Sequence, residues 1–488
     1  MNGAPDSRIQ LLKDAPIRHD GKFVLYWMTA ARRTHYNFGL QQAILRAGEL
    51  HKPLVVVEHL PCGSGWDGER HHQFVLGGMA DNARRLSRAS FTYYPYLERK
   101  GGEAVALVAA LADLACMVVV DYFPQTDWLR PCHELAARLP CRLECVDSNG
   151  LLPLSASEKV FSTAYSFRRF SQSELPDHLP EGPSPDPLSR LSLPRRAGLP
   201  AKLVQKWPPL RLDDAKRLSE SFSSLPINHS VPPVSIRGGA AAARRALSRF
   251  LRTRLSGYHE RRNHPDDEAT SNLSTYLHFG HISAHEIFRR VMKVEGWSLG
   301  DLSHRADGRR SGWWRVGEDA EAFLDQLVTW RELGFNFCSQ RDDYDQYHSL
   351  PAWARSTLET HSRDFKPHLY SLDDLEAAQT HDRVWNAAQM QLVTEGRMHN
   401  YLRMVWGKKI LEWSPSPQEA LEVMIELNNK YALDGRDPNS YTGIFWVLGR
   451  YDRPWGPERP IFGKIRYMSS ENTVKKLRMR NYLEKFAP

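Results

Sequence analysis

The chain of 488 residues has few cysteines and no long apolar run. Its six cysteines form no C-x-x-C pair, which argues against a disulfide framework or an iron–sulfur site and favours reduced, buried thiols. No apolar stretch is long enough to cross a membrane, and residues 1–22 lack the apolar segment of a secretory signal. We therefore expect a cytoplasmic protein without a membrane partner.

A dinucleotide fingerprint is also missing. No G-x-G-x-x-G follows the first expected strand, residues 23–28, because Met28 leads instead into the segment TAARRTHYNFG. An ordinary Rossmann dinucleotide site is therefore not expected. Parallel sheets nevertheless bind ligands at the carboxyl ends of their strands, which leaves room for a small chromophore or nucleotide.

The composition is otherwise that of a globular protein, with 41% hydrophobic and 25% charged residues. This length predicts at least two domains, because a single core does not grow so large. The formal net charge is +8, and residues 431–488 carry an excess of five positive charges. A basic surface near the C-terminus favours a polyanionic partner.

Short β-rich runs alternate with helical stretches in the first third of the chain, which predicts a Rossmann-like parallel α/β domain over residues 20–155. The expected strands are residues 23–28, 53–60, 91–97, 117–123 and 141–147.

A proline-rich segment separates this region from the rest. Residues 171–235 contain 12 of the 31 prolines, which predicts a linker over residues 156–236 with only short helices. From residue 237 to residue 488 the apolar residues recur at helical spacing, for example over residues 319–338 and 381–413. We expect an all-helical second domain there.

Ten of the 14 tryptophans lie in the last 192 residues. Trp406 and Trp413 fall two turns apart on one face of an expected helix. Two indoles at this spacing could pass an electron, but the same spacing is typical of core residues.

Three polar motifs in this region are open to two interpretations each. The loop with Asp434, Gly435, Asp437 and Asn439 could grip a ligand or cation, or could be an ordinary turn. Ser271 and Ser274 stand where a helix is expected to begin and suit either a phosphate or N-cap duty. His278, His281 and His285 could share one face, but without a second ligand cluster we expect no metal site.

Five segments, taken together and in this order, resemble the class II cyclobutane pyrimidine dimer photolyases of the photolyase/cryptochrome superfamily. The segments are SNLSTYLHFG, THDRVWNAAQM, MVWGKKILEW, LNNKYALDGRDPNSYTGIFW and FGKIRYMS. The resemblance extends from about residue 258 to residue 468 and is weaker over the first 155 residues. It implies an antenna-type α/β domain, a long linker and a helical domain that binds FAD, reduced in its active form, as well as DNA.

The resemblance implies a set of cofactor-binding residues. The FAD phosphates and ribityl chain would contact Tyr258, Ser271, Asn272, Leu273 and Ser274. The remaining cofactor positions, around the isoalloxazine, would be Trp385, Asn386, Arg403, Asn428, Asp434, Gly435, Asp437 and Asn439, with Asn428 facing N5 and Arg403 paired with Asp434.

The resemblance also assigns an electron path and a DNA surface. Trp406 would lie nearest the flavin, Trp385 in the middle and Trp413 near the protein surface. The dimer pocket and the surface that holds the distorted duplex would comprise Gln326, Trp330, Tyr401, Met404, Trp446, Arg453, Trp455 and Arg466.

The sequence departs from the family pattern at three places. MTAARRTHYNF stands where many relatives have a pattern closer to M-x-R-D-Q-R, so the identity and presence of a second, antenna chromophore stay open. Asn400 stands where a glycine is expected, and Gln326 where an acidic residue normally meets the dimer.

These features predict a monomeric lyase that repairs cyclobutane pyrimidine dimers in UV-damaged double-stranded DNA with light. The electron would pass from photoexcited reduced FAD to a flipped-out dimer. The alternative is a cryptochrome-like photoreceptor without repair activity, which Trp330, Trp446 and the basic C-terminal segment disfavour. An iron–sulfur (6-4) photolyase is excluded, since Cys338 is the sole cysteine of the helical region.

Overall fold

The computed structural model describes residues 2–189, 193–194, 196–213 and 222–487. Its chain divides into two compact units, each of which is assembled from separate stretches of sequence. The first unit comprises residues 1–158, 174–248 and 273–297, and the second comprises residues 159–173, 249–272 and 298–488. No described helix is both long and apolar enough to cross a membrane.

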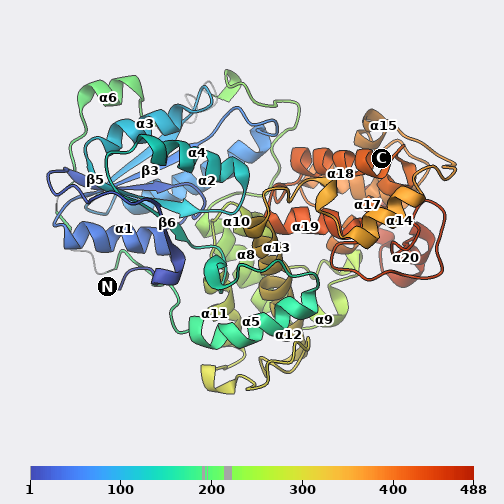
Figure 1. The fold of residues 1–488 in the computed structure, drawn as a ribbon. Coiled ribbons are helices and arrows are strands. Elements are labelled where there is room, and N and C mark those ends of the chain that lie inside the picture. Colours follow the sequence, from blue (N-terminus) through green and yellow to red (C-terminus); the bar gives the residue numbers. More distant parts are fainter. Residues whose placement is uncertain (1, 190–192, 195, 214–221, 488) are drawn as a thin grey trace. The chain divides into compact units, whose positions relative to one another are not determined.

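The first unit is built on a six-stranded sheet with the order β1-β6-β5-β2-β3-β4 (Figure 1). All neighbouring strands are parallel except β1, which runs antiparallel to β6 at the edge. The strands are β1 (Ile9–Lys13), β2 (Phe23–Met28), β3 (Leu54–Leu60), β4 (Thr92–Leu97), β5 (Ala115–Tyr122) and β6 (Leu143–Asp147). The predicted fold class is confirmed, and β1 is a strand that the sequence pattern missed.

Helices cover both faces of this sheet, as β2 illustrates. Phe23, Leu25 and Trp27 belong to the core beneath α3 (Glu103–Ala112) and α4 (Thr126–Arg138), while Val24, Tyr26 and Met28 belong to the core beneath α1 (Phe38–Glu49). Burial on both faces explains why the central strands are apolar without alternation. The unit is completed by α2 (Glu69–Leu86), α6 (Ala201–Lys206), α10 (Ser274–His278) and α11 (Ala284–Val294).

The described part of the second unit is helical and contains no strand. Its helices are α9 (Tyr258–Arg261), α12 (Glu318–Leu324), α13 (Arg331–Gln340), α14 (Ala352–Thr360), α15 (Leu372–Glu376), α16 (Arg383–Glu395), α17 (Asn400–Trp413), α18 (Pro417–Tyr431), α19 (Pro438–Val447), α20 (Ser470–Lys476) and α21 (Arg480–Lys485). Helix α17 packs against α16, α18 and α19. Figure 1 labels α17, α18 and α19 within this group.

Two helices run from one unit into the other: α5 (Ala164–His178) and α8 (Ala240–Thr253). Helix α5 has 15 residues and includes Pro176 in its last turn, so the expectation of only short helices in the linker is wrong at this point. Pro176 cannot donate a helix bond to the carbonyl of Gln172, and the helix ends two residues later. Part of the predicted linker, residues 190–192, 195 and 214–221, lies outside the described residues.

Candidate functional site

The three tryptophans assigned to the electron path lie in the second unit and form one continuous row of indoles. Trp385 of α16 lies between the other two, with its ring centroid 6.5 Å from that of Trp406 and 5.6 Å from that of Trp413. The rings of Trp385 and Trp406 are nearly parallel, at 5°. Although Trp406 and Trp413 share α17, the chain between them passes through the neighbouring helix.

Hydrogen bonds fix the orientation of two of these indoles. Trp385 Nε1 donates to the carbonyl of Trp406 at 3.0 Å, and Trp406 Nε1 donates to Oε1 of Gln389 at 2.9 Å. All three rings are at most 2% exposed. They are therefore held rigidly in a dry environment, which suits electron transfer as well as packing.

The outer end of the chain carries a pair of residues that the sequence reasoning missed. The ring of Tyr370 lies 5.3 Å from that of Trp413, and its hydroxyl is 2.6 Å from Nδ1 of His381. Trp413 itself is 2% exposed, whereas His381 is exposed. Trp413 is thus separated from solvent by one further layer of rings.

A polar cluster lies at the next turn of the same helix. Arg403 of α17 donates from Nη1 to Oδ1 of Asn428 and from Nη2 to Oδ1 of Asp434, both at 3.1 Å. Asn428 Nδ2 in turn donates to Oγ of Ser440 on α19 at 2.8 Å. The predicted Arg403–Asp434 pair is present, and Arg403 lies three residues from Trp406, so both face one side of α17.

The loop from α18 to α19 is shaped by a close backbone approach. A Cβ at Gly435 would lie 2.8 Å from the carbonyl oxygen of Asn428, so only glycine fits. Asp437 is the N-cap of α19 and accepts from the N–H of Asn439 at 2.9 Å, while Asn439 itself is exposed. The turn interpretation is therefore correct for Asp437, and the loop also presents Asp434 to Arg403.

Further polar groups gather at Asn272. This residue has a positive φ of 57°, a conformation that asparagine tolerates better than most residues. Its Oδ1 accepts from Oγ1 of Thr270 at 3.1 Å and from Nη1 of Arg397 at 2.6 Å. Neither ring nitrogen of the neighbouring buried His399 makes a hydrogen bond to a described residue, although the Arg262 carbonyl faces the ring.

Burial lowers the pKa of His399 to about 4, so its ring is neutral at pH 7. The sequence reasoning missed both Arg397 and His399; the signal was the polar segment RMHN directly before α17. A neutral ring beside a guanidinium offers one hydrogen-bond donor, one acceptor and one positive charge.

Other predicted cofactor residues have different surroundings. Tyr258 is buried between the rings of Phe250 and Phe323, and burial raises its pKa. Asn386 exchanges hydrogen bonds with Thr380, donating to its carbonyl at 2.8 Å. The assignment of Asn386 to the flavin therefore stays a prediction.

The segment from Ser271 to Ser274 spans the passage from the second unit to the first. Helix α10 starts at Ser274 with Leu273 as its N-cap, and no side chain caps it. N-cap duty for either serine is therefore not found, and a phosphate contact stays a prediction. Leu273 is buried, Ser271 half-buried and Ser274 exposed.

Two predicted pocket residues stack on each other. The rings of Trp330 and Trp446 lie 4.6 Å apart between centroids with 14° between their planes. This contact leaves no space for a base between them, so any base must contact their open edges or outer faces. Both side chains are half-buried.

The helix before Trp330 is irregular. Residues 319–338 are helical, as their spacing predicts, but Asp325–Trp330 form a turn of π-helix between α12 and α13. This turn brings Asp325, five residues earlier, to Trp330, whose Nε1 donates to Oδ2 of Asp325 at 3.2 Å. Gln326 is half-buried and makes no side-chain hydrogen bond to a described residue.

The first turn of α17 carries the remaining predicted pocket residues. Tyr401 and Met404 are half-buried, and Asn400 is exposed at the first position of the helix. An asparagine is readily accommodated at a helix start. Their contact with a dimer stays a prediction.

The three predicted DNA-contact residues near the C-terminus converge. The guanidinium carbons of Arg453 and Arg466 lie 4.9 and 5.1 Å from the ring centroid of Trp455. Trp455 Nε1 donates to Oδ1 of Asp452 at 3.0 Å, which fixes the ring. Trp455 also lines a cavity of about 480 Å³ with Trp353 and the hydroxyls of α14. Two exposed cations on one fixed indole suit a nucleic-acid backbone.

The three histidines of residues 278–285 do not form a metal site. His278 ends α10, His281 lies in the following loop and His285 lies in α11. The ring of His281 stacks on Phe74, and that of His285 packs edge-on against Phe38. Among the described residues no group of three metal-ligating side chains is found. These histidines are core residues.

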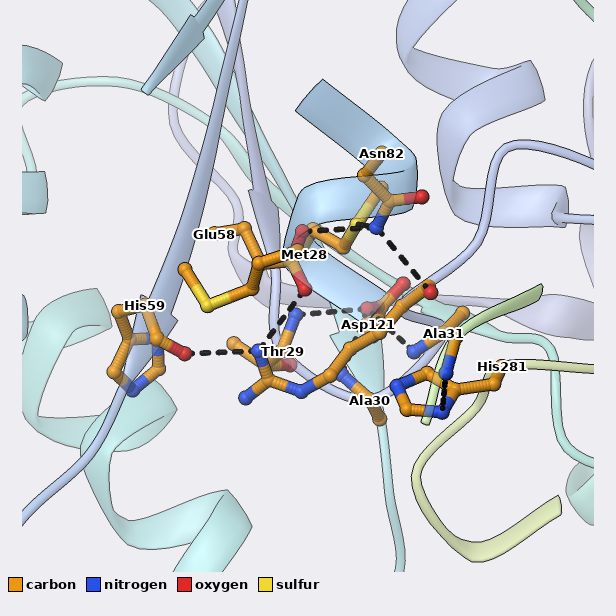
Figure 2. Close-up of polar contacts among 12 residues, drawn as sticks. Met28, Thr29, Ala30, Ala31, Glu58, His59, Asn82, Asp121 and His281 are labelled. Carbon is orange, nitrogen blue, oxygen red and sulfur yellow. Dashed lines mark hydrogen bonds and ion pairs between the residues drawn. The ribbon is translucent and has the colours of Figure 1, made fainter. Parts of the chain in front are cut away.

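The strand ends of the first unit are filled by the protein's own groups. Asp121, at the end of β5, accepts from the backbone N–H groups of Thr29, Ala30 and Ala31 at 2.9 Å each, as Figure 2 shows. Three consecutive amides beside a topological switch point would otherwise suit a ligand phosphate. Here the carboxylate of Asp121 takes that place.

A buried ion pair closes the adjacent strand end. Arg32 donates from Nη1 to the carbonyl of His59 at 2.8 Å and lies 3.4 Å from Oε1 of Glu58, whose Oε2 accepts from Nδ2 of Asn82 at 2.9 Å (Figure 2). Burial and Arg32 lower the pKa of His59 to about 3. A second chromophore therefore does not fit at these strand ends, and we give it no role in the proposed reaction.

The sequence was compared with known proteins. No family model matches it. The deoxyribodipyrimidine photo-lyase of Methanothermobacter thermautotrophicus is 34% identical over 469 residues, which cover 95% of this chain and 94% of that protein. Those of Potorous tridactylus and Arabidopsis thaliana are 33% and 32% identical and cover 99% and 98% of this chain, and 84% and 92% of their own lengths. The chain belongs to the deoxyribodipyrimidine photo-lyase family.

Solved structures agree with this photo-lyase fold. A class III photolyase from Agrobacterium tumefaciens superposes with a TM-score of 0.66 at 16% identity, over 96% of this chain and 86% of that chain. A cryptochrome of Synechocystis sp. PCC6803 superposes with a TM-score of 0.65 at 15% identity, over 97% and 89%. At these identities the likeness concerns the fold alone.

Proposed function

We propose that this chain is a class II photo-lyase that binds FAD in its helical unit and splits cyclobutane pyrimidine dimers in UV-damaged duplex DNA under light. The observation that carries the proposal is the arrangement on α17. One side of this helix bears Trp406, the inner end of a chain of three indoles, and Arg403, which joins Asn428 and Asp434.

The residues around Arg403 and Asn272 fit the proposed cofactor. FAD has an anionic pyrophosphate, a polyhydroxylated chain and a ring system with several acceptors. Arg397, which pairs with Glu395 and donates to Asn272, and the neutral ring of the buried His399 offer donors and an acceptor for the first two. Arg403, fixed by Asp434 and Asn428, offers a rigid donor for the third. When bound, reduced FAD would supply the light-driven electron that opens the cyclobutane ring.

The other residues would position the substrate and supply electrons to the cofactor. The chain Trp413–Trp385–Trp406 would carry electrons inward from the surface. The stacked Trp330 and Trp446 would contact a dimer taken out of the duplex, whose extrusion is made easier by its weakened pairing. Arg453, Trp455 and Arg466 would hold the distorted backbone. We expect the protein to act as a monomer.

The test is light-dependent loss of a defined thymine dimer from a duplex oligonucleotide, with chemically reduced protein. Repair in the light and none in the dark supports the proposal. Absence of repair in the light by protein that carries reduced flavin would overturn it and favour a photoreceptor.

A further inference from the structure

The π-turn at Asp325–Trp330 places a buried carboxylate against the edge of one stacked indole. In an α-helix, residues five apart point in different directions, whereas the wider π-turn brings them to one side. Asp325 is 7% exposed, and its Oδ2 accepts from Nε1 of Trp330 at 3.2 Å. The irregular turn therefore makes a contact that a regular helix would not allow.

The carboxylate is itself fixed by a second residue. Arg168 of α5 binds Oδ1 of Asp325 from Nε at 3.0 Å and from Nη2 at 2.9 Å, and donates from Nη1 to the carbonyl of Gly308 at 3.1 Å. Arg168 is 7% exposed, so the ion pair is shielded from solvent. Arg310, on the exposed side, lies 3.7 Å from Oδ2. The bidentate contact occupies Oδ1, so Oδ2 is directed at Trp330.

The two stacked indoles are held unequally. Trp330 is anchored through its N–H and packs against the phenylalanine cluster of Phe161, Phe167 and Phe170. Trp446 makes no hydrogen bond to a described residue through its indole. One ring is thus fixed in angle by a hydrogen bond, and the other is held by packing.

We propose that Asp325 is a positioning residue of the dimer pocket, which fixes the angle of Trp330 through the indole N–H so that this ring forms a rigid wall for the dimer. The inference deepens the proposed function and rests on it. A wall that is already ordered saves the cost of ordering a side chain when the dimer binds. Asp325 acts on dimer affinity and leaves the indole chain at Trp406 unaffected.

The experiment is a double-mutant cycle of Asp325→Asn and Trp330→Phe, read as the dissociation constant for a duplex with one thymine dimer in the dark. Phenylalanine keeps the aromatic ring but has no N–H. In Asp325→Asn the amide oxygen stays with the two donors of Arg168, so the amide N–H2 faces the indole N–H and their hydrogen bond is lost. Loss of this one hydrogen bond should weaken dimer affinity about fivefold in either single variant. Asp325→Asn should have less than about a twofold effect once Trp330 is phenylalanine, because the bond is already gone.

Arg168→Gln is the matched control, because it removes the positive charge but keeps an amide donor for Oδ1, so that Oδ2 still faces the indole N–H. It should lower the melting temperature yet change dimer affinity less than about twofold. Equal losses of affinity in Arg168→Gln and Asp325→Asn would overturn the proposal, as would equal effects of Asp325→Asn in both backgrounds. These outcomes would mean that Asp325 only stabilises the fold.

A readout without DNA separates this inference from the proposed function. Stacked indoles give a coupled signal in the circular dichroism of the tryptophan bands, which Trp446→Phe would identify by difference. We expect Asp325→Asn to reduce that signal and Arg168→Gln to preserve it. An unchanged signal in folded Asp325→Asn would contradict the role of Asp325 even if repair is observed. Equal binding of damaged and undamaged DNA by the wild type would instead contradict the proposed function alone.

Discussion

Single residues in this protein act according to their burial and partners more than according to their type. Lys408 and Lys409 are neighbours in α17, and both are buried. Lys409 pairs with Glu412 at 2.9 Å, which raises its pKa. Among the described residues Lys408 bonds only the carbonyl of Val447, and burial lowers its pKa to about 7. Adjacent lysines therefore have opposite shifts.

This difference predicts a pH-dependent stability for Lys408→Met. The folded-state pKa of about 7 lies below the unfolded value of 10.5, so the unfolded chain binds more protons between these values. The stability of the wild type relative to Lys408→Met should rise by about 4 kcal/mol as the pH increases from 7 to 10.5.

Chemical denaturation across this pH range measures the effect. Lys409→Met is the control, because a raised pKa gives stability that is present below 10.5 and is lost above it. A flat difference for Lys408→Met would show that this lysine is not desolvated.

Gln326 gives a second prediction at this scale. If its amide donates to the dimer, the repair yield should be nearly flat across neutral pH, because an amide does not titrate. Gln326→Glu should make the yield fall as pH rises, since a carboxylic acid donates only while protonated, and burial raises its pKa above about 4.3.

The measurement is the repair yield against pH for both proteins with fully reduced flavin. A flat Glu variant or a steep wild type would place Gln326 outside the dimer contact. In that case Asp325, which positions Trp330, would be the residue of this π-turn that affects the dimer pocket.

At the scale of elements, helices α16 and α17 together make the indole chain. Spacing along α17 suggested a path from Trp406 to Trp413, but the ring between them is Trp385 of α16. Contact between two helices, which sequence periodicity does not report, determines the order of the three rings.

Trp406→Phe should nearly abolish light-driven reduction of the oxidised flavin, because it removes the inner ring of the chain. Repair by chemically reduced protein should be largely unchanged. The measurement is flavin absorbance under illumination with an external electron donor. Phe222→Leu is the control, because Phe222 belongs to the first unit and is not one of the three indoles. Normal photoreduction in Trp406→Phe would contradict the assigned electron path.

The loop between α18 and α19 depends on one glycine. Gly435→Ala would place a Cβ 2.8 Å from the carbonyl oxygen of Asn428. We expect a loss of about 1–3 kcal/mol in unfolding free energy from this overpacking. Flavin affinity should also decrease, because Asp434 is displaced from Arg403. Gly443→Ala, with open space around its Cβ, is the control. Unchanged stability and flavin affinity in Gly435→Ala would contradict the close approach.

At the scale of the whole molecule, we expect the charge distribution to govern association with DNA. Arg453 and Arg466 flank Trp455 within the basic C-terminal segment. Binding of damaged duplex should weaken steeply with salt, and Arg466→Ala should reduce the slope of log affinity against log salt by about one.

The control for Arg466→Ala is Arg480→Ala, an exposed residue of α21 whose charge is paired with Glu484. Its salt slope should remain nearly that of the wild type. Trp446→Ala should instead lower affinity for damaged DNA more than for undamaged DNA. Equal losses on both DNAs would count against a dimer pocket at Trp446.

The parallel α/β sheet, the helical region and the family could all be predicted from the amino-acid sequence. Continuous apolar strands and helical spacing are local patterns, and motifs such as LNNKYALDGRDPNSYTGIFW keep their residue types in order along the chain. The pair Arg403–Asp434 could be foreseen because Asp434 lies within one motif and Arg403 directly precedes another.

Other features could not be predicted, because they depend on contacts between residues far apart in the sequence. The antiparallel strand β1 depends on pairing with β6, more than a hundred residues away. The π-turn at Trp330 is stabilised by Arg168 from a distant helix, and His399 is neutral because of what surrounds it. Hydrogen bonds and desolvation act through space, so residues far apart in sequence set them. For the same reason the carboxylate of Asp121 occupies the strand-end amides, which no local motif could have revealed.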